Sequence, residues 1–354
     1  MQDHKVEERF IGVDFHKETL TVTRLRKDGS RDGKTQTYKS TVQGITEFRD
    51  TCTAQDHVVV EATYNWALFA DIFEEFDGDL CLSHPAKNRL IAESKNKNDT
   101  VDSKILADLK RTNFLAEAWI APREVRDARE ILRHRCSLVR VQTMLKNRVR
   151  VILAKAGRSI DATDIFGVAA LKELEAMDLG ETRNLIIKGF VEVARQLRAS
   201  IVECEKDIAA RVKLSKSAQR IDSIKGFGAI AALTIDAEIG DILRFRNSGK
   251  IVSYAGMAPI TRASGGIIRH GGITKQGSPW LRWILIEATQ HAINAYPQLA
   301  ALYRRVSSNT GSRKNAGRIA VARQLLVCIY CMLKHDVEFD PARIGRQGDA
   351  RAKK

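Results

Sequence analysis

The order of apolar segments in the first third of the chain limits its possible folds more than any other feature of the sequence. Between Arg9 and Leu25, apolar and polar residues partly alternate and β-branched residues are frequent, which predicts a strand, a turn at His16–Glu18 and a second strand. The pattern then predicts a strand, a helix, a strand, a helix, a strand and two helices, at residues 35–42, 42–52, 57–63, 66–76, 79–85, 86–94 and 101–111. Strands followed by helices in this order predict an α/β domain over residues 9–118.

Further domains are expected, because 354 residues are too many for one ordinary core. Pro122 opens a long segment with apolar residues at helical spacing and basic residues on much of its other face. With a second helix over residues 181–212, it predicts a helical arm at 119–215, a candidate dimerising coiled coil with imperfect heptads. Residues 216–340 are expected to form a mostly α C-terminal domain, and residues 341–354 a basic, disordered tail.

The net charge of +15, from 58 Lys+Arg against 43 Asp+Glu, indicates a polyanionic partner, most simply nucleic acid. The excess is uneven. Residues 259–354 hold 16 basic against 5 acidic residues, and residues 123–158 hold 11 against 3. Within the second stretch we expect four residues to bind nucleic acid, namely Arg140, Lys146, Arg148 and Arg150. General solubility is the alternative explanation of the charge.

The sequence predicts a cytoplasmic chain. It has no run of about 18 apolar residues, so no membrane span is expected, and its polar N-terminus has no apolar signal-peptide core. Six scattered cysteines do not suggest a disulfide framework. Cys328 and Cys331 form a C-x-x-C inside an apolar helical segment, and without a second pair at finger spacing they are expected to be small buried residues rather than zinc ligands.

Four carboxylates stand at or near the ends of predicted elements. Asp14 lies in the first strand, IGVD, and Glu61 ends the apolar strand VVVE. Asp99 and Asp102 are spaced i, i+3, which places both on one face at the start of a helix. A carboxylate at the end of a buried strand is costly unless its charge is compensated. Converging carboxylates suit Mg²⁺, so the four together predict a metal site able to act on a phosphodiester.

Each carboxylate also has a simpler interpretation. Asp14 could be a turn residue, Glu61 a solvent-facing strand end, Asp99 a helix N-cap and Asp102 a first-turn carboxylate. Asp108 on the same helix is a weaker alternative ligand, because six residues past Asp102 it faces a different direction. The order of Asp on a first strand, Glu on a later strand and Asp on a helix resembles the RNase H-like fold of RuvC-type nucleases.

A glycine-rich turn in the C-terminal part is a second candidate site. Lys225, Gly226 and Gly228 stand between two predicted helices and resemble a helix-hairpin-helix turn. Backbone amides at the start of the second helix could hold a DNA phosphate. A plain helix–helix turn explains the same residues.

Ser264 precedes two glycines in a basic stretch. A serine needs a base, a metal or cationic neighbours to act as a nucleophile, and flanking glycines allow a phosphate to approach the backbone. A phosphate-binding loop without a covalent role is equally consistent, and Ser253 and Ser278 compete for the nucleophile's part. The basic residues expected to bind nucleic acid here are Arg262, Arg269, Lys275 and Arg282.

Over residues 9–305 the chain resembles the IS110 (IS110/IS1111) family of transposases. The resemblance rests on IGVDFHK, VVVEAT, KNKNDTVDSKILAD, RHRCSLVRVQTMLKNRV, SIKGFGAIAALTIDAEIGD and YAGMAPITRASGGIIRHGGITKQGSPWLR. It implies an RNase H-like (RuvC-like) DEDD domain and a C-terminal transposase domain bearing a serine. The matching residues are Asp14, Glu61, Asp99 and Asp102 for Mg²⁺ and Ser264 as nucleophile. Tyr64, Asn98 and Lys225 depart from common family patterns, which affects local geometry and removes no carboxylate.

The family resemblance implies a recombinase that cuts and rejoins donor and target DNA. It further implies a phosphoserine link to DNA, a structured guide RNA and a homo-oligomer with composite sites. A metal nuclease or junction resolvase that uses only the four carboxylates is the alternative, and a covalent protein–DNA adduct separates the two. A non-catalytic nucleic-acid-binding protein is a third possibility, which metal-dependent cleavage would exclude.

Overall fold

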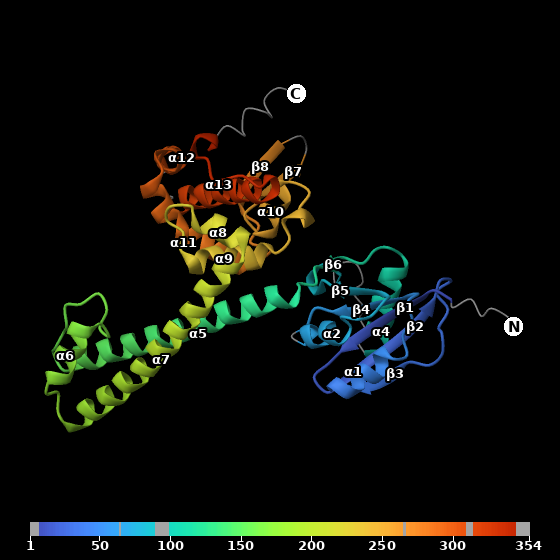
Figure 1. Cartoon of the computed structure of the whole chain (residues 1–354), viewed down its shortest axis with the longest axis horizontal. Coiled ribbons are helices and arrows are strands. Elements are labelled where there is room, and N and C mark those ends of the chain that lie inside the picture. Colours follow the sequence, from blue (N-terminus) through green and yellow to red (C-terminus); the bar gives the residue numbers. More distant parts are fainter. Residues whose placement is uncertain (1–6, 64, 89–98, 265–266, 309–313, 345–354) are drawn as a thin grey trace. The chain divides into compact units, whose positions relative to one another are not determined.

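The computed structural model describes residues 7–63, 65–88, 99–264, 267–308 and 314–344, with the backbone only at 262–264, 267–270 and 343. The chain divides into two compact units, Met1–Arg123 and Glu124–Lys354. Each is described by itself below (Figure 1). Of the tail predicted at residues 341–354, the structure describes 341–344, where a short 3-10 helix forms instead of disordered chain. Residues 345–354 and the predicted helical residues 89–94 lie outside the described part of the chain.

The first unit is a mixed sheet with helices on both faces. The strands are β1 (Arg9–Phe15), β2 (Thr19–Arg26), β3 (Gln36–Lys39), β4 (Asp56–Glu61), β5 (Asp79–Ser83) and β6 (Glu117–Ala118). Their order is β3-β2-β1-β4-β5-β6. Strands β1, β4 and β5 run parallel, while β2 is antiparallel to β1 and β3, and β6 is antiparallel to β5. The sheet confirms an α/β domain and is compatible with an RNase H-like domain.

The two faces of the sheet pack against different helices, as the residues of β1 show. Ile11, Val13 and Phe15 are buried in the larger core, together with residues of α1 (Val42–Arg49) and α2 (Trp66–Ile72). Alternation directs Phe10 and Gly12 to the other face, where Phe10 packs with Ala107 of α4 (Asp99–Arg111). A short helix, α3 (Pro85–Asn88), follows β5. Among the described helices of this unit, α4 is thus the one that covers the second face of β1.

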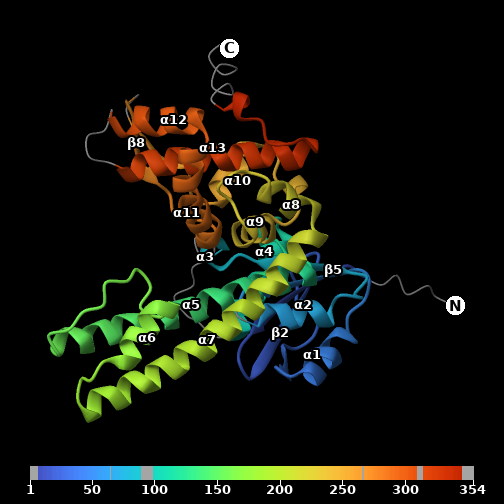
Figure 2. The same cartoon turned by 60° about the vertical axis from the view of Figure 1, so that its left-hand side comes forward.

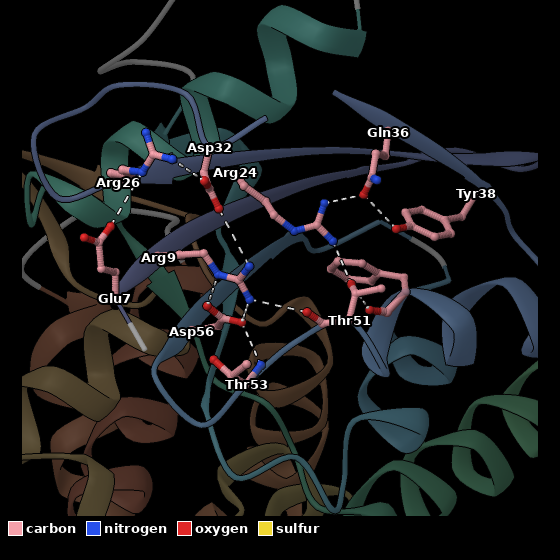
Figure 3. Close-up of polar contacts among 11 residues, drawn as sticks. Glu7, Arg9, Arg24, Arg26, Asp32, Gln36, Tyr38, Thr51, Thr53 and Asp56 are labelled. Carbon is pink, nitrogen blue, oxygen red and sulfur yellow. Dashed lines mark hydrogen bonds and ion pairs between the residues drawn. The ribbon is translucent and has the colours of Figure 1, made fainter. Parts of the chain in front are cut away.

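A buried network of polar residues fixes the edge of the sheet where β1 begins (Figure 3). Asp56 is fully buried and accepts hydrogen bonds from Arg9 Nε and Nη2 at 2.7 and 2.6 Å. The neighbouring Arg24 donates to Thr51 Oγ1 at 2.7 Å and lies over the Phe48 ring. Each buried charge therefore has a partner, as low-dielectric surroundings require. This network anchors the fold at the edge opposite the carboxyl end of β1.

The second unit begins with the predicted arm, formed by α5 (Arg123–Lys155) and α7 (Glu181–Leu214), with the short α6 (Val168–Ala176) between them. One cluster near the α5–α6 connection, including Leu145, Phe166 and Val191, joins all three helices. A second cluster joins the other end of the arm to the C-terminal helices. The two long helices lie alongside one another in both views (Figures 1 and 2).

The rest of the second unit is mostly helical, as expected. Its elements are α8 (Lys216–Asp222), α9 (Ala229–Ile239), η1 (Ile242–Arg244), α10 (Ser248–Tyr254), β7 (Pro259–Ser264), β8 (Ile267–Ile273), α11 (Pro279–Ala295), α12 (Pro297–Ser308), α13 (Lys314–His335) and η2 (Pro341–Arg343). The antiparallel β7–β8 pair was not predicted, because the sequence there shows glycine and serine enrichment rather than a clear alternation.

Helix α13 is, among the described residues, the one helix long and apolar enough by length and composition to span a membrane. The sequence predicts no membrane span here, because it contains no run of about 18 apolar residues. Its side chains Leu325, Leu326 and Ile329 are fully buried in the core of this unit, which gives its apolar composition a role in packing. Cys331 packs partly buried against the same core, and burial raises the pKa of the Cys328 thiol.

Candidate metal and nucleic-acid sites

The carboxyl ends of β1 and β4 bring two predicted acidic residues to one edge of the sheet. The strands are parallel, and Val13 pairs with Val60. The next residues, Asp14 and Glu61, therefore lie at the same edge of the sheet. Their side chains point to the same face, because paired residues of parallel strands point the same way. That face is the one that α4 covers.

Helix α4 brings the other two predicted ligands to this edge. A Cβ on Gly12 would lie 1.8 Å from the Ser103 carbonyl oxygen, so only glycine permits so close an approach of helix and strand. Ser103 is fully buried and its Oγ lies 2.8 Å from Thr23 Oγ1 of β2. Asp99 and Asp102 precede this contact in the first turn of α4, next to the end of β1.

His16, which the sequence pattern places in a turn, joins the acidic cluster. Its Nε2 lies 3.0 Å from Asp14 Oδ2 and 3.5 Å from Asp99 Oδ1. Asp14, His16 and Asp99 offer ligand atoms that all lie within 4.8 Å of one another, the one such group among the described residues. The sequence feature that could have identified His16 is its position two residues after Asp14, because alternate residues of a strand lie on the same face.

The electrostatics of Asp14 fit a site for a cation. The residue is only 6% exposed. The pKa of Asp14 is raised to about 6, because the effect of burial, the largest cause, and of the charges of Asp99 and Asp102 outweighs the lowering by His16. A buried carboxylate among like charges is stabilised by an opposite charge. The donor set of carboxylate oxygens and an imidazole nitrogen is suited to a divalent metal ion.

The remaining predicted ligands lie near this group without being part of it. Asp102 is half-buried and acts on the pKa of Asp14 through its charge. Glu61 is half-buried and pairs in register with Ser83 of β5. Asp108 is paired with Arg111 at 2.9 Å, so this weaker alternative has a structural partner on its own helix.

Two buried polar atoms lie just beyond the carboxyl ends of β4 and β5. Thr63 Oγ1 and His84 Nδ1 have no hydrogen-bond partner among the described residues. They follow Glu61 and Ser83, at the same edge as Asp14. Unsatisfied buried polar atoms are uncommon in folded proteins, so this edge has spare hydrogen-bonding capacity for a bound group.

The four arm residues predicted to bind nucleic acid have different surroundings on α5. Arg140 and Arg148 are exposed. Arg150 is also exposed and donates to the Thr163 carbonyl oxygen at 3.2 Å. Lys146 is paired with Asp164 at 2.9 Å, which partly neutralises it.

The glycine-rich turn lies between α8 and α9, as predicted. Gly226 has φ +100°, and a Cβ there would lie 2.9 Å from the Ala292 backbone nitrogen of α11. The Lys225 amide donates to Tyr296 Oη at 2.8 Å. Both contacts fix the turn to the core of its own unit. Gly228 is exposed and precedes α9 as its N-cap.

Ser264 is the last residue of β7 and pairs with Ile267 of β8. The following residues 265–266, and the side chains of Ser264, Arg262 and Arg269, lie outside the described part of the structure. Lys275 is exposed with φ 56°. Arg282 donates to the Ala255 carbonyl oxygen at 3.0 Å, so its guanidinium supports the loop.

The two competing serines both have local structural roles. Ser253 Oγ donates to the Gly249 carbonyl oxygen within α10 at 3.0 Å. Ser278 Oγ caps α11 by accepting from the Leu281 amide, and it donates to Glu238 at 2.8 Å. Each hydroxyl is already used by the fold.

Two family models match the chain on either side of these sites. A model of IS110-type DEDD transposases, described as "Transposase", matches residues 11–157. A model described as "Transposase IS116/IS110/IS902 family" matches residues 218–304. The first match includes all of α5 and the acidic edge, the name used here for the sheet edge with Asp14, His16, Glu61, Asp99 and Asp102. The second includes the glycine-rich turn and the hairpin with Ser264.

Three similar proteins carry transposase names. A probable family 20 transposase of Pseudomonas aeruginosa is 26% identical over 64% of this chain and 68% of its own length. The transposase for insertion sequence element IS1111A of Coxiella burnetii is 26% identical over 55% of this chain and 54% of its own. The transposase for insertion sequence element IS1328 of Yersinia enterocolitica is 24% identical over 79% and 82%. The chain thus spans between about half and four fifths of these relatives.

Proposed function

The chain belongs to the IS110 family of transposases, and we propose that it cuts and rejoins DNA to move an insertion sequence. The observation that carries the proposal is the convergence of Asp14, His16 and Asp99 at one edge of the sheet, inside the stretch matched to DEDD transposases. The first unit is then an RNase H-like, RuvC-like domain. The proposed place of action is the cytoplasm.

Asp14 and Asp99 would hold the metal ion, with Glu61 and Asp102 as further carboxylates at the same edge. A divalent ion bound there, Mg²⁺ in this proposal, supplies positive charge to the attacking and leaving oxygens of a phosphodiester. His16 keeps Asp14 and Asp99 oriented through contacts of 3.0 and 3.5 Å. Close packing of α4 on Gly12 holds the carboxylates in place before DNA arrives, which favours catalysis by preorganisation.

Ser264 is the proposed nucleophile. Its Oγ would form a bond to a DNA phosphorus while the bond from phosphorus to the 3′ oxygen breaks, and the released 3′ oxygen takes up a proton. Attack by a free 3′ hydroxyl of the partner strand reverses the step and returns the serine hydroxyl. The phosphoserine link keeps the energy of the phosphodiester, so no ATP is needed. The local hydrogen bonds of Ser253 and Ser278 support Ser264 over its competitors.

Donor DNA, target DNA and a structured guide RNA are the proposed partners. The basic face of α5 supports binding of more than one nucleic acid, because phosphate neutralisation supplies most of non-specific affinity. Lys225, Gly228, Arg262, Arg269 and Lys275 are proposed as further contacts in the second unit.

A homo-oligomer is also proposed. Exposed apolar side chains along the arm support it, namely Val141, Met144 and Val151 on α5 and Leu185, Ile186, Val193 and Val202 on α7. Exposed apolar side chains in such number are typical of association surfaces.

A metal-dependent nuclease without a covalent intermediate is the second candidate. It is favoured by one observation: the acidic cluster is assembled entirely within the first unit. In that case water would attack the phosphodiester, and the hairpin of β7 and β8 would only bind DNA.

The test of the proposed function uses two aspartates of the same helix. Asp102→Asn should abolish strand cleavage and recombination in Mg²⁺ or Mn²⁺, because the acidic edge loses a charge. Asp108→Asn is the matched control, since Asp108 pairs with Arg111, and it should retain cleavage. Full recombination by Asp102→Asn, or equal loss in both variants, would refute the proposed metal site.

A further inference from the structure

A groove between α5 and α11 combines two tryptophans with the basic face of the arm. Its lining includes Arg135, Val139 and Arg140 of α5 and Pro279, Trp280 and Trp283 of α11, around a cavity of about 500 Å³. Such a volume is typical of sites for small molecules or single chemical groups. We call these six residues the tryptophan groove. None of the six is a residue of the acidic edge or of the β7–β8 hairpin.

The two indole rings of the groove have different surroundings. The Cζ atoms of Arg133 and Arg140 lie 5.8 and 5.9 Å from the Trp280 ring centroid, within the range of cation–π attraction. Trp283 meets Trp280 edge to face, with centroids 5.9 Å apart, and remains 39% exposed. One ring is therefore held by arginines, while the other presents aromatic surface to solvent.

A buried glutamate fixes the start of α11 beside α5. Glu238 is 5% exposed and accepts from Ser278 Oγ at 2.8 Å and from Arg133 at 3.2 Å. Ser278 is the N-cap of α11, so the carboxylate connects the cap of one helix to the basic face of the other. Arg129 of α5 adds a further ionic contact to Glu238 at 3.9 Å. The start of α11 is thus tied to α5 by a buried charge that has several partners.

The charge around the groove favours an anionic ligand. Arg140 forms no ion pair with any described acidic residue, while Arg135 is paired with Glu205. Between Arg133 and Arg158 the sequence contains 8 Lys+Arg and no Asp or Glu. The first turn of α11 also lacks acidic residues. An exposed aromatic ring beside unneutralised arginine is the combination that binds single-stranded nucleic acid.

We propose that the tryptophan groove binds an unpaired nucleotide, with its base stacked on Trp283 and its phosphate beside Arg140. Every nucleobase has a π-face, so binding would tolerate different sequences. A paired base offers no free face within a duplex, so the groove would select single strands. The proposal rests on the proposed function only in that the chain acts on nucleic acid. The nucleotide belongs to either a displaced DNA strand or a single-stranded RNA segment.

The experiment measures the affinity of the full chain for short oligonucleotides of thymidine or uridine and for a DNA duplex of the same length. Trp283→Ala should weaken single-strand binding about ten-fold or more, because one base loses its stacking partner. Duplex affinity should stay within about two-fold. Trp283→Phe keeps an aromatic face and should lose less. Phe114→Ala removes another exposed aromatic side chain, 65% exposed in the first unit, and should change neither affinity.

Photocrosslinking then locates the base directly. A single strand that carries 5-iodouracil should form an adduct at Trp283 or Trp280, and the comparison of the DNA and RNA strands identifies the source of the nucleotide. Unchanged single-strand affinity in Trp283→Ala would overturn the proposal, as would crosslinks confined to other residues. A change of oligomeric state with unchanged affinity would overturn it too, in favour of a protein interface. Metal-dependent cleavage by the same preparation reports on the proposed function independently.

Discussion

The acidic edge of the first unit and the serine hairpin of the second are built on opposite principles. At the acidic edge, buried strands and a closely packed helix carry the side chains. Asp14 is 6% exposed, while the side chains of His16 and Asp99 extend from these elements and are about half exposed. At the hairpin, two strands pair with each other and Thr261, Gly271 and Gly272 are exposed. The first site is therefore fixed by the core of its domain, while the second is a projecting two-stranded element.

This difference separates two demands of the proposed chemistry. A metal site needs several charged ligands held together against their mutual repulsion, which only a packed core can achieve. A nucleophile that attacks DNA and later releases it needs access to the strand and glycines that let a phosphate approach. Variants at buried positions of the acidic edge should therefore change both stability and activity, whereas variants in the hairpin should affect activity alone.

Gly12→Ala should have the largest effect on stability. The new Cβ would meet the Ser103 carbonyl oxygen at 1.8 Å, so α4 must move away from β1, at a cost of about 3 kcal/mol or more. Thermal denaturation and metal titration should show lower stability and weaker metal binding together. Gly189→Ala in α7 is the control, because a Cβ there meets nothing within 4 Å, and it should stabilise by roughly 0.5–1 kcal/mol. A stable Gly12→Ala protein with normal metal affinity would mean that the close packing of α4 on β1 does not hold the metal ligands in place.

His16→Ala should lower metal affinity and cleavage by about 10- to 100-fold, the usual effect of removing a residue that orients metal ligands. Its stability should hardly change, because the side chain is 53% exposed. Calorimetric titration with Mg²⁺ and Mn²⁺ measures the affinity, and Lys17→Ala provides an exposed neighbour as control. Equal behaviour of the two variants would remove His16 from the site.

Asp14→Asn should stabilise the metal-free protein while abolishing cleavage. The pKa of Asp14 is raised from the ordinary value of 3.8 to about 6 in the folded protein. The folded protein therefore loses stability as the pH rises from 3.8 through 6, because the unfolded chain ionises this carboxyl more easily. At neutral pH the gain should be on the order of 1–3 kcal/mol. Denaturant unfolding in a chelator at pH 5 and pH 8 should show a larger gain at pH 8. A destabilised variant at pH 8 would mean that Asp14 is favourably paired without metal.

The smallest expected effect concerns the basic face of α5. Joint replacement of Arg140, Arg148 and Arg150 by alanine should make duplex binding less sensitive to salt. The slope of the logarithm of the binding constant against the logarithm of the salt concentration should become about 2–3 less steep. The control replaces Arg195, Lys206 and Arg211 of α7, which are paired with acidic neighbours, and should change the slope less. Equal slopes in both triple variants would mean that this face of α5 does not contact DNA.

Local patterns predicted the acidic edge better than the hairpin. The strand signals around Asp14 and Glu61 and the i, i+3 spacing of Asp99 and Asp102 require only short-range reasoning. The part of His16 was missed because its contact with Asp99 depends on how closely α4 approaches β1. That approach is decided by Gly12, whose significance appears only when helix and strand are seen together.

The hairpin and the tryptophan groove could not be read from sequence for a related reason. Apolar and polar residues alternate only weakly in β7 and β8. Neither strand is clearly predicted from the sequence, so their pairing is not predicted either. Trp280 and Arg140 are far apart in the chain, and their contact forms only where α11 packs beside α5. The prediction of Ser264 came from family resemblance rather than from its neighbours, and it remains a prediction.

The serine mechanism is tested most directly by trapping the covalent protein–DNA adduct and identifying the modified residue by mass spectrometry. We expect one adduct, a phosphoserine at Ser264, which disappears in Ser264→Ala while folding and DNA binding persist. Ser253→Ala is the control, because its hydroxyl bonds only within α10 among the described contacts, and it should keep the adduct. Recombination at the parental rate by Ser264→Ala, without any adduct, would contradict the serine mechanism and leave the carboxylate-only nuclease in its place.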